Sequence, residues 1–158
     1  MAEEIWQGLN ELAAERSTLA RITNQLRLLS MCIWGLTGAN LSLAMAYGRL
    51  SLGSLPPDLP AWGVAILTAC VFITGVCFDS IRRRGDVFFE AISNELHAGA
   101  AAFLEINKNY REEARESRIL IRQFASASEV PLVPGKFGPG IMVLINVVLM
   151  GLVLFLRD

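Results

Sequence analysis

The stretch LLSMCIWGLTGANLSLAMAYG, residues 28–48, contains no Asp, Glu, Lys or Arg. Residues 59–78 and residues 137–156 share this property. Each stretch has 20 or 21 residues, and a helix of about 20 residues crosses the ~30 Å hydrocarbon core of a bilayer. All 14 Lys and Arg residues and all 15 Asp and Glu residues lie elsewhere. The sequence therefore predicts an all-α integral membrane protein with three transmembrane helices.

The remaining residues divide around these stretches. The expected order is an amphipathic helix over 1–27, transmembrane helices at 28–48 and 59–78 joined by a short external loop at 49–58, a cytoplasmic helical segment over 79–130, a Pro/Gly linker at 131–140 and a third transmembrane helix at 141–156. The first helix is expected to continue into the first crossing without a break. The third, which follows Pro139, is expected to span, with a shallow or re-entrant placement as the alternative.

The segment 79–130 is the most charged part of the chain and also carries an apolar stripe. Its apolar residues follow a three–four spacing, typical of a coiled-coil-like seam, and they are Phe89, Ile92, Leu96, Phe103, Ile106 and Tyr110. The pattern predicts one long helix, with a hairpin broken near residues 97–102 as the alternative. Part of this stripe is expected to meet another subunit, which favours a symmetric, ring-like homo-oligomer.

The placement of Lys and Arg predicts the orientation. Three precede the first crossing, one lies between the first two crossings, and nine lie between the second and third. By the positive-inside rule, the N-terminus and the segment 79–130 are cytoplasmic. The triplet Arg82, Arg83 and Arg84 follows the second crossing closely, and we interpret it as a topology anchor or as a contact for lipid headgroups.

Two kinds of residue inside the uncharged stretches are candidates for helix association. Small residues recur on its surface, as in helices that approach closely in lipid, and they are Gly35, Gly38, Ser42 and Ala46. Asn40 and Asn146 are amides deep in the first and third stretches. They either line a pore or polar seam between subunits, or hydrogen-bond to a neighbouring helix and stabilise packing.

No pattern in the chain indicates catalysis or a bound cofactor. Neither a Ser/His/Asp arrangement nor a phosphate-binding loop is present, and the single His and three Cys lack the spacing of a metal site. The net charge of -1 provides no basic field for nucleic acid. We therefore expect no enzyme, no cofactor, no metal and no direct contact with nucleic acid.

Two stretches resemble a known group of proteins. Residues 24–29 (NQLRLL) enter the first crossing, and residues 81–96 (IRRRGDVFFEAISNEL) leave the second. Over roughly residues 20–100 the chain resembles small bacterial membrane proteins of the SLATT-like and RipA-like type. The resemblance implies a homo-oligomeric protein of the bacterial inner membrane, in some cases a pore-forming effector of anti-phage defence that partner proteins trigger. The third hydrophobic stretch departs from the two-crossing pattern of that group.

Three functions follow as hypotheses. The preferred one is a ring-like homo-oligomer that forms a pore or perturbs the membrane, regulated through its cytoplasmic helices, with Asn40 facing the axis. The alternative is a non-conducting scaffold or accessory subunit of a larger membrane complex, with a protein partner bound by the cytoplasmic helices. An enzyme acting on lipid is the third, and it lacks a converging acid–base pair. Membrane lipids are expected partners in each case.

Overall fold

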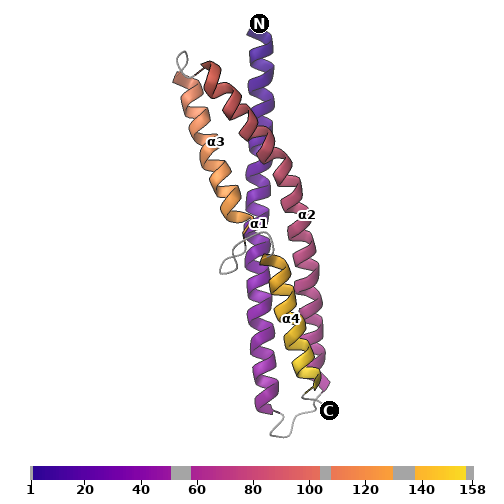
Figure 1. Ribbon diagram of the computed structural model, residues 1–158. Coiled ribbons are helices and arrows are strands. Elements are labelled where there is room, and N and C mark those ends of the chain that lie inside the picture. The colour runs from indigo at the N-terminus through magenta and orange to yellow at the C-terminus, as the bar shows by residue number, and fades with distance from the viewer. Residues whose placement is uncertain (1, 51–57, 104–107, 130–137, 156–158) are drawn as a thin grey trace. The chain divides into compact units, whose positions relative to one another are not determined.

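The protein consists of four α-helices over the residues that the structure describes. The computed structural model describes residues 2–50, 58–103, 108–129 and 138–155, and the side chains of 13–46, 62–96, 112, 114–129 and 138–155. Its helices are α1 (Ala2–Leu50), α2 (Asp58–Phe103), α3 (Lys108–Ala127) and α4 (Gly138–Phe155) (Figure 1). The all-α prediction is confirmed.

Three of these helices contain segments long and apolar enough to cross a bilayer. The segments are Ala13–Ala46 in α1, Trp62–Leu96 in α2 and Gly138–Phe155 in α4. Large apolar side chains on them face outward, for example Ile66 at 60% exposure and Leu144 at 62%. Such exposure is costly in water and neutral in lipid. The chain is a multi-pass membrane protein.

The first helix runs through the predicted boundary at residue 28 without interruption, as the sequence predicts. No proline occurs before Pro56, and good helix formers dominate on both sides of the boundary. Helix α2 begins directly after Pro57, and Pro60 lies in its first turn, where a missing N–H has no intrahelical partner to lose.

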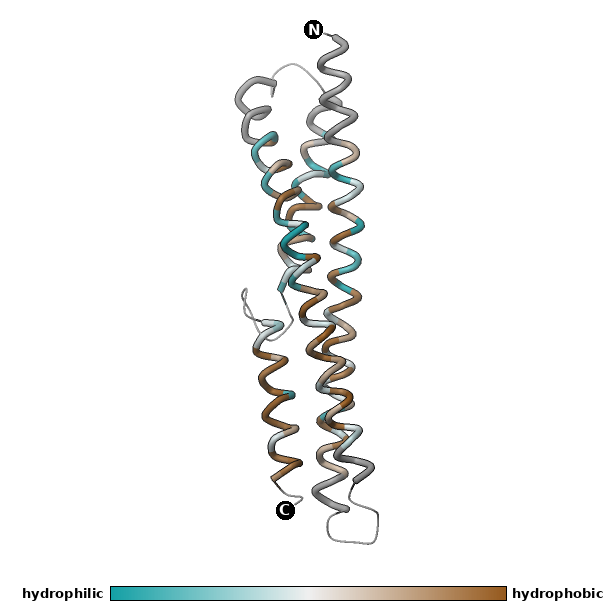
Figure 2. Tube along the Cα trace, turned by 90° about the vertical axis from the view of Figure 1, so that its right-hand side faces the viewer, coloured by the Kyte–Doolittle hydropathy of each residue, from teal (hydrophilic) through white to brown (hydrophobic). Residues whose placement is uncertain are grey.

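The chain divides into two compact units. We call Met1–Arg27 with Ser80–Ser128 the charged unit, and Leu28–Asp79 with Glu129–Asp158 the apolar unit. Hydropathy follows the same division: α4 is hydrophobic along almost its whole length, whereas α3 alternates between hydrophilic and hydrophobic residues (Figure 2). Helices α1 and α2 each contribute one part to both units.

The expectation of one long helix over 79–130 is wrong. Helix α2 ends at Phe103 and α3 begins at Lys108, which agrees with the hairpin alternative. The break also lies later than expected, because Gly99 and the neighbouring alanines stay helical. Alanine is the best helix former, so one glycine among alanines does not end a helix. Folding back lets the apolar face of α3 pack on α2 instead of remaining exposed.

The predicted Pro/Gly linker at 131–140 ends earlier than expected. Residues 138–140 were placed in it, but α4 already begins at Gly138, and both Gly138 and Pro139 are buried. Proline is compatible with the first turn of a helix, so Pro139 does not delay the start. The resulting helix of 18 residues is just within the range that spans a bilayer.

Within the apolar unit, glycines of α2 allow close packing. A Cβ at Gly63 would lie 2.6 Å from Cδ2 of Leu43 on α1, and a Cβ at Gly75 would lie 3.3 Å from Cγ2 of Val143 on α4. A small core nearby joins the three helices and consists of Val64, Val153, Leu43, Ala44 and Met150. The close contacts of α2 therefore depend on glycines that the sequence did not single out.

Within the charged unit, three helices share one apolar core. Its most buried members are Leu19, Ile22, Leu26, Ile92, Phe124 and Ala127. The rings of Phe89 and Phe124 lie 5.7 Å apart, a separation typical of attractive aromatic pairs. At the edge of this core, Arg16 of α1 forms an ion pair of 3.7 Å with Glu116 of α3.

This core contains the described part of the predicted oligomer seam. Ile92 is fully buried, Phe89 contacts Phe124, and Leu96 is half-buried. The side chains of Phe103, Ile106 and Tyr110 lie outside the described residues. Helix α3 therefore packs on Phe89 within one chain, and the contact of this seam with another subunit stays a prediction.

Gly85 is a closely packed position of the charged unit. A Cβ there would overlap the Phe124 ring and lie 3.0 Å from Cγ2 of Ile22. We predict that Gly85→Ala destabilises the protein by about 1–3 kcal/mol through overpacking. The measurement is the free energy of unfolding of the purified protein in detergent.

Gly151→Ala is the control for this prediction, because nothing lies within 4 Å of a Cβ at Gly151. It is expected to leave stability unchanged or raise it slightly, as alanine favours helix. Equal effects of the two substitutions would contradict the packing described at Gly85.

Candidate functional site

A buried group of polar side chains joins the three helices of the apolar unit. We call it the amide cluster; it consists of Thr37 and Asn40 of α1, Thr68 of α2 and Asn146 of α4. Both asparagines have 0% exposure, and both threonines have less than 10%. The two asparagines are thus enclosed by the described helices of the apolar unit.

The two asparagines are linked directly. Nδ2 of Asn40 donates to Oδ1 of Asn146 at 2.7 Å and to Oγ1 of Thr68 at 3.1 Å. Nδ2 of Asn146 donates to Oγ1 of Thr37 at 3.0 Å and to the carbonyl of Met142 at 2.8 Å. Hydrogen bonds therefore connect α1 to α2 and α1 to α4.

The threonines also use their own helices. The hydroxyl of Thr68 donates to the carbonyl of Val64 at 2.8 Å, which leaves its oxygen free to accept from Asn40. Because Thr37 and Asn40 are three residues apart, they share one face of α1. Both contact Asn146: Asn40 donates a hydrogen bond to it, and Thr37 accepts one from it.

One acceptor in the cluster is not satisfied. Oδ1 of Asn40 is buried and has no hydrogen-bond partner in the described structure. A buried acceptor without a partner costs about 1–3 kcal/mol. Asn146, in contrast, uses its carbonyl oxygen and both amide hydrogens. The two asparagines are therefore unequal, and Asn146 is the better satisfied of the pair.

The sequence identified half of this cluster. Asn40 and Asn146 were singled out, and one of the two interpretations given for them was hydrogen bonding to a neighbouring helix. Thr37 and Thr68 were missed, because a threonine can satisfy itself on its own helix. Depth was the available signal: Asn40, Thr68 and Asn146 all lie near the middle of their uncharged stretches.

The small residues of the first crossing lie on the outside of the apolar unit. Gly35, Gly38 and Ser42 are exposed, and Ala46 is half-buried. Nothing lies within 4 Å of a Cβ at either glycine, and the Ser42 hydroxyl donates to the carbonyl of Gly38 at 2.9 Å. This surface is open, and its predicted use in packing between subunits stays a prediction.

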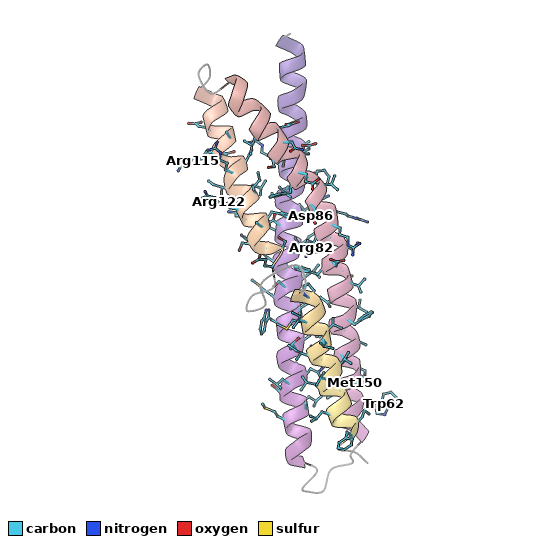
Figure 3. All side chains as sticks on the ribbon, in the orientation of Figure 1. Trp62, Arg82, Asp86, Arg115, Arg122 and Met150 are labelled. Carbon is cyan, nitrogen blue, oxygen red and sulfur yellow. The ribbon has the colours of Figure 1, made fainter. Side chains whose placement is uncertain are left out.

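The arginine triplet lies in α2 within the charged unit. Arg83 and Arg84 are exposed and Arg82 is half-buried. Arg82 and Arg83 also interact with other residues of the chain. Near the start of the same helix, Trp62 is 67% exposed and projects outward (Figure 3), as a side chain at a membrane interface does.

The described residues offer no site for metal chemistry. No group of three or more His, Cys, Asp or Glu side chains that could hold a metal ion occurs in this part of the chain. The cysteines are free thiols, with Cys32 and Cys77 exposed and Cys70 half-buried. The chemistry available to the amide cluster is hydrogen bonding, which suits helix association.

Comparison with known proteins adds no relative. No protein-family model matches the chain, and no curated protein or solved structure is similar enough to count as a match. The resemblance to the SLATT-like and RipA-like group therefore stays a prediction from the sequence.

The inequality of the two asparagines gives a testable difference. We predict that Asn146→Leu destabilises the protein by about 1–2 kcal/mol, because satisfied bonds between membrane helices are lost. Asn40→Leu should cost less, because it removes two hydrogen bonds instead of three, while either variant leaves one buried amide oxygen without a partner. The measurement is the unfolding free energy in lipid bicelles.

Ser42→Ala is the matched control, since the Ser42 hydroxyl is exposed and bonds only to its own helix in the described structure. It should change stability by less than about 0.5 kcal/mol. An effect of Ser42→Ala as large as that of Asn146→Leu would argue against the amide cluster as a stabilising site.

Proposed function

We propose that the protein is a non-conducting membrane scaffold, in which three crossings anchor a charged helical unit beside the bilayer. The observation that carries this proposal is the direct bond between Asn40 and Asn146 inside one subunit. Amides that hydrogen-bond to one another at 0% exposure are unavailable to line a pore. The channel hypothesis depended on Asn40 facing an axis, so its main argument is weakened.

The charged unit supports the same proposal. Its three helices enclose their own apolar core, and its outer surface carries the charged side chains. A self-contained helical unit of this kind is suited to presenting a surface to a partner protein. The distribution of Lys and Arg favours a cytoplasmic location for it, with the N-terminus on the same side.

A pore or membrane-perturbing homo-oligomer is the second candidate. The open surface at Gly35 and Gly38 favours it, because small exposed residues let helices of two subunits approach closely in lipid. A conducting path would then require residues other than the amide cluster. The bacterial inner membrane and a role in anti-phage defence are supported by the sequence resemblance.

Conductance separates the two candidates. The purified chain, reconstituted in planar bilayers at a range of voltages, is predicted to give no current above that of empty bilayers. Asn40→Asp should also give none, because the side chain at position 40 faces the interior of the subunit. Discrete channel events that Asn40→Asp alters in ion selectivity would contradict the scaffold proposal.

Oligomeric state tests the surface at Gly38. We expect the 17.3 kDa chain to form homo-oligomers in mild detergent and Gly38→Ile to shift them towards monomer, because a large side chain prevents close approach. The measurement is native mass spectrometry.

Gly151→Ile is the matched control, since position 151 is equally open but lies on α4, outside the small-residue surface. Its oligomers should persist. Oligomers that both variants retain would exclude this surface as the contact between subunits.

A further inference from the structure

We propose that the charged unit binds the phosphate groups of anionic phospholipids through four arginines. These are Arg21 and Arg27 of α1, Arg84 of α2 and Arg122 of α3, and we call them the arginine band. All four are exposed, and within the described part of the chain none of them forms an ion pair. The proposal is independent of whether the protein conducts.

One contact brings three of these arginines to a common level. Around Gly85 of α2, the nearest side chains are those of Ile22 on α1 and Phe124 on α3. Arg21 and Arg84 are the immediate neighbours of Ile22 and Gly85, and Arg122 is two residues from Phe124. The three helices therefore present arginines near one cross-section of the charged unit.

This cross-section lies close to the uncharged stretches along the chain. Gly85 is seven residues of continuous helix beyond the end of the second stretch at residue 78, about 10 Å at 1.5 Å per residue. Arg27 directly precedes the first stretch. Headgroups occupy the first ~5–8 Å outside the hydrocarbon, and a long arginine side chain extends towards them.

The acidic residues are distributed differently. Asp86 is an exposed acid next to Gly85, and Glu129, five residues after Phe124, is exposed as well. Glu90 and Glu95 follow further along α2. Helix α3 returns beside α2 (Figure 1). Glu112 and Glu116 lie in the first half of α3, and Phe124 lies near its end. Among the described residues, exposed arginines therefore outnumber exposed acids near the Gly85 cross-section, and exposed acids outnumber exposed arginines further along α2 and α3.

The directions of the arginines favour lipid over a soluble anion. Each helix turns its buried face to the other two, so exposed side chains on the three helices diverge. Figure 3 shows Arg122 projecting from the outer side of α3. Diverging guanidinium groups do not converge on one phosphate, whereas a leaflet surrounds the protein with many. Arginine binds phosphate through two parallel hydrogen bonds, which suits each separate contact.

Arg122 is the informative member of the band. The other three flank predicted crossings, where topology alone accounts for basic residues. Arg122 belongs to α3, which contains no candidate membrane span in the described structure. A headgroup bound by Arg122 would hold the hairpin of α2 and α3 at the membrane surface, so anionic lipid becomes a ligand of the cytoplasmic helices.

Native mass spectrometry of the full chain tests this proposal. The protein is released from nanodiscs of phosphatidylcholine containing one third phosphatidylglycerol, and retained phosphatidylglycerol is counted. Arg122→Gln is expected to lower its apparent affinity about fivefold, the effect of losing one basic contact near the surface. Arg115→Gln is the matched control: Arg115 is also exposed on α3 but lies two turns further from Phe124 (Figure 3), and its substitution should have no effect.

Three outcomes would overturn the proposal. Equal losses for Arg122→Gln and Arg115→Gln would show a general charge effect. Equal retention of phosphatidylcholine and phosphatidylglycerol would show that anionic headgroups are not selected. Displacement of the bound lipid by inorganic phosphate in the same assay would identify a soluble anion as the ligand. Circular dichroism of both variants verifies that their helices are intact.

Discussion

Hydrocarbon offers no hydrogen bonds, and this constraint governs the apolar unit. Each polar group that enters a bilayer must find a partner inside the protein. The backbone meets the requirement by forming helices, and Thr74 meets it by bonding to Cys70 of its own helix. An asparagine side chain cannot satisfy all its hydrogen-bonding groups on its own helix. Asn40 and Asn146 therefore hydrogen-bond to each other across two helices. The helix arrangement of this unit and the burial of its polar residues therefore have one cause.

The charged unit is held together by a different kind of contact. Its helices associate by burying apolar side chains, with Phe124 on Phe89 and Gly85 as the central contact. Its surface is then left for charges. In the functions proposed above, the apolar unit holds the protein in the bilayer and the charged unit binds headgroups or a partner.

The sequence predicted the fold well where a single physical pattern controlled it. Uncharged stretches of about 20 residues predicted the spans, and the absence of proline predicted an unbroken α1. It failed where tertiary contacts decide. The position of the hairpin depends on Phe124 packing against α2, and no local residue encodes that partner. The contact glycines were misassigned for the same reason: Gly63 and Gly75 face bulky side chains, whereas Gly35 and Gly38 face outward.

The amide cluster was predictable in part. Amides deep in uncharged stretches must have partners or meet water, so Asn40 and Asn146 were recognisable as special. Their pairing joins residues 106 positions apart, and it depends on how α1 and α4 are rotated about their axes. Rotation is set by the packing of whole helices, which periodicity in one segment does not reveal.

The most direct test of the central claim is a double-mutant cycle on Asn40 and Asn146. Unfolding free energies of the two single leucine variants, the double variant and the parent chain would be measured in bicelles at protein concentrations where the chain is monomeric. The account predicts a coupling energy of about 0.5–1.5 kcal/mol, the range for hydrogen bonds between membrane helices. Additive effects of the two substitutions would contradict a bond between these side chains within one subunit.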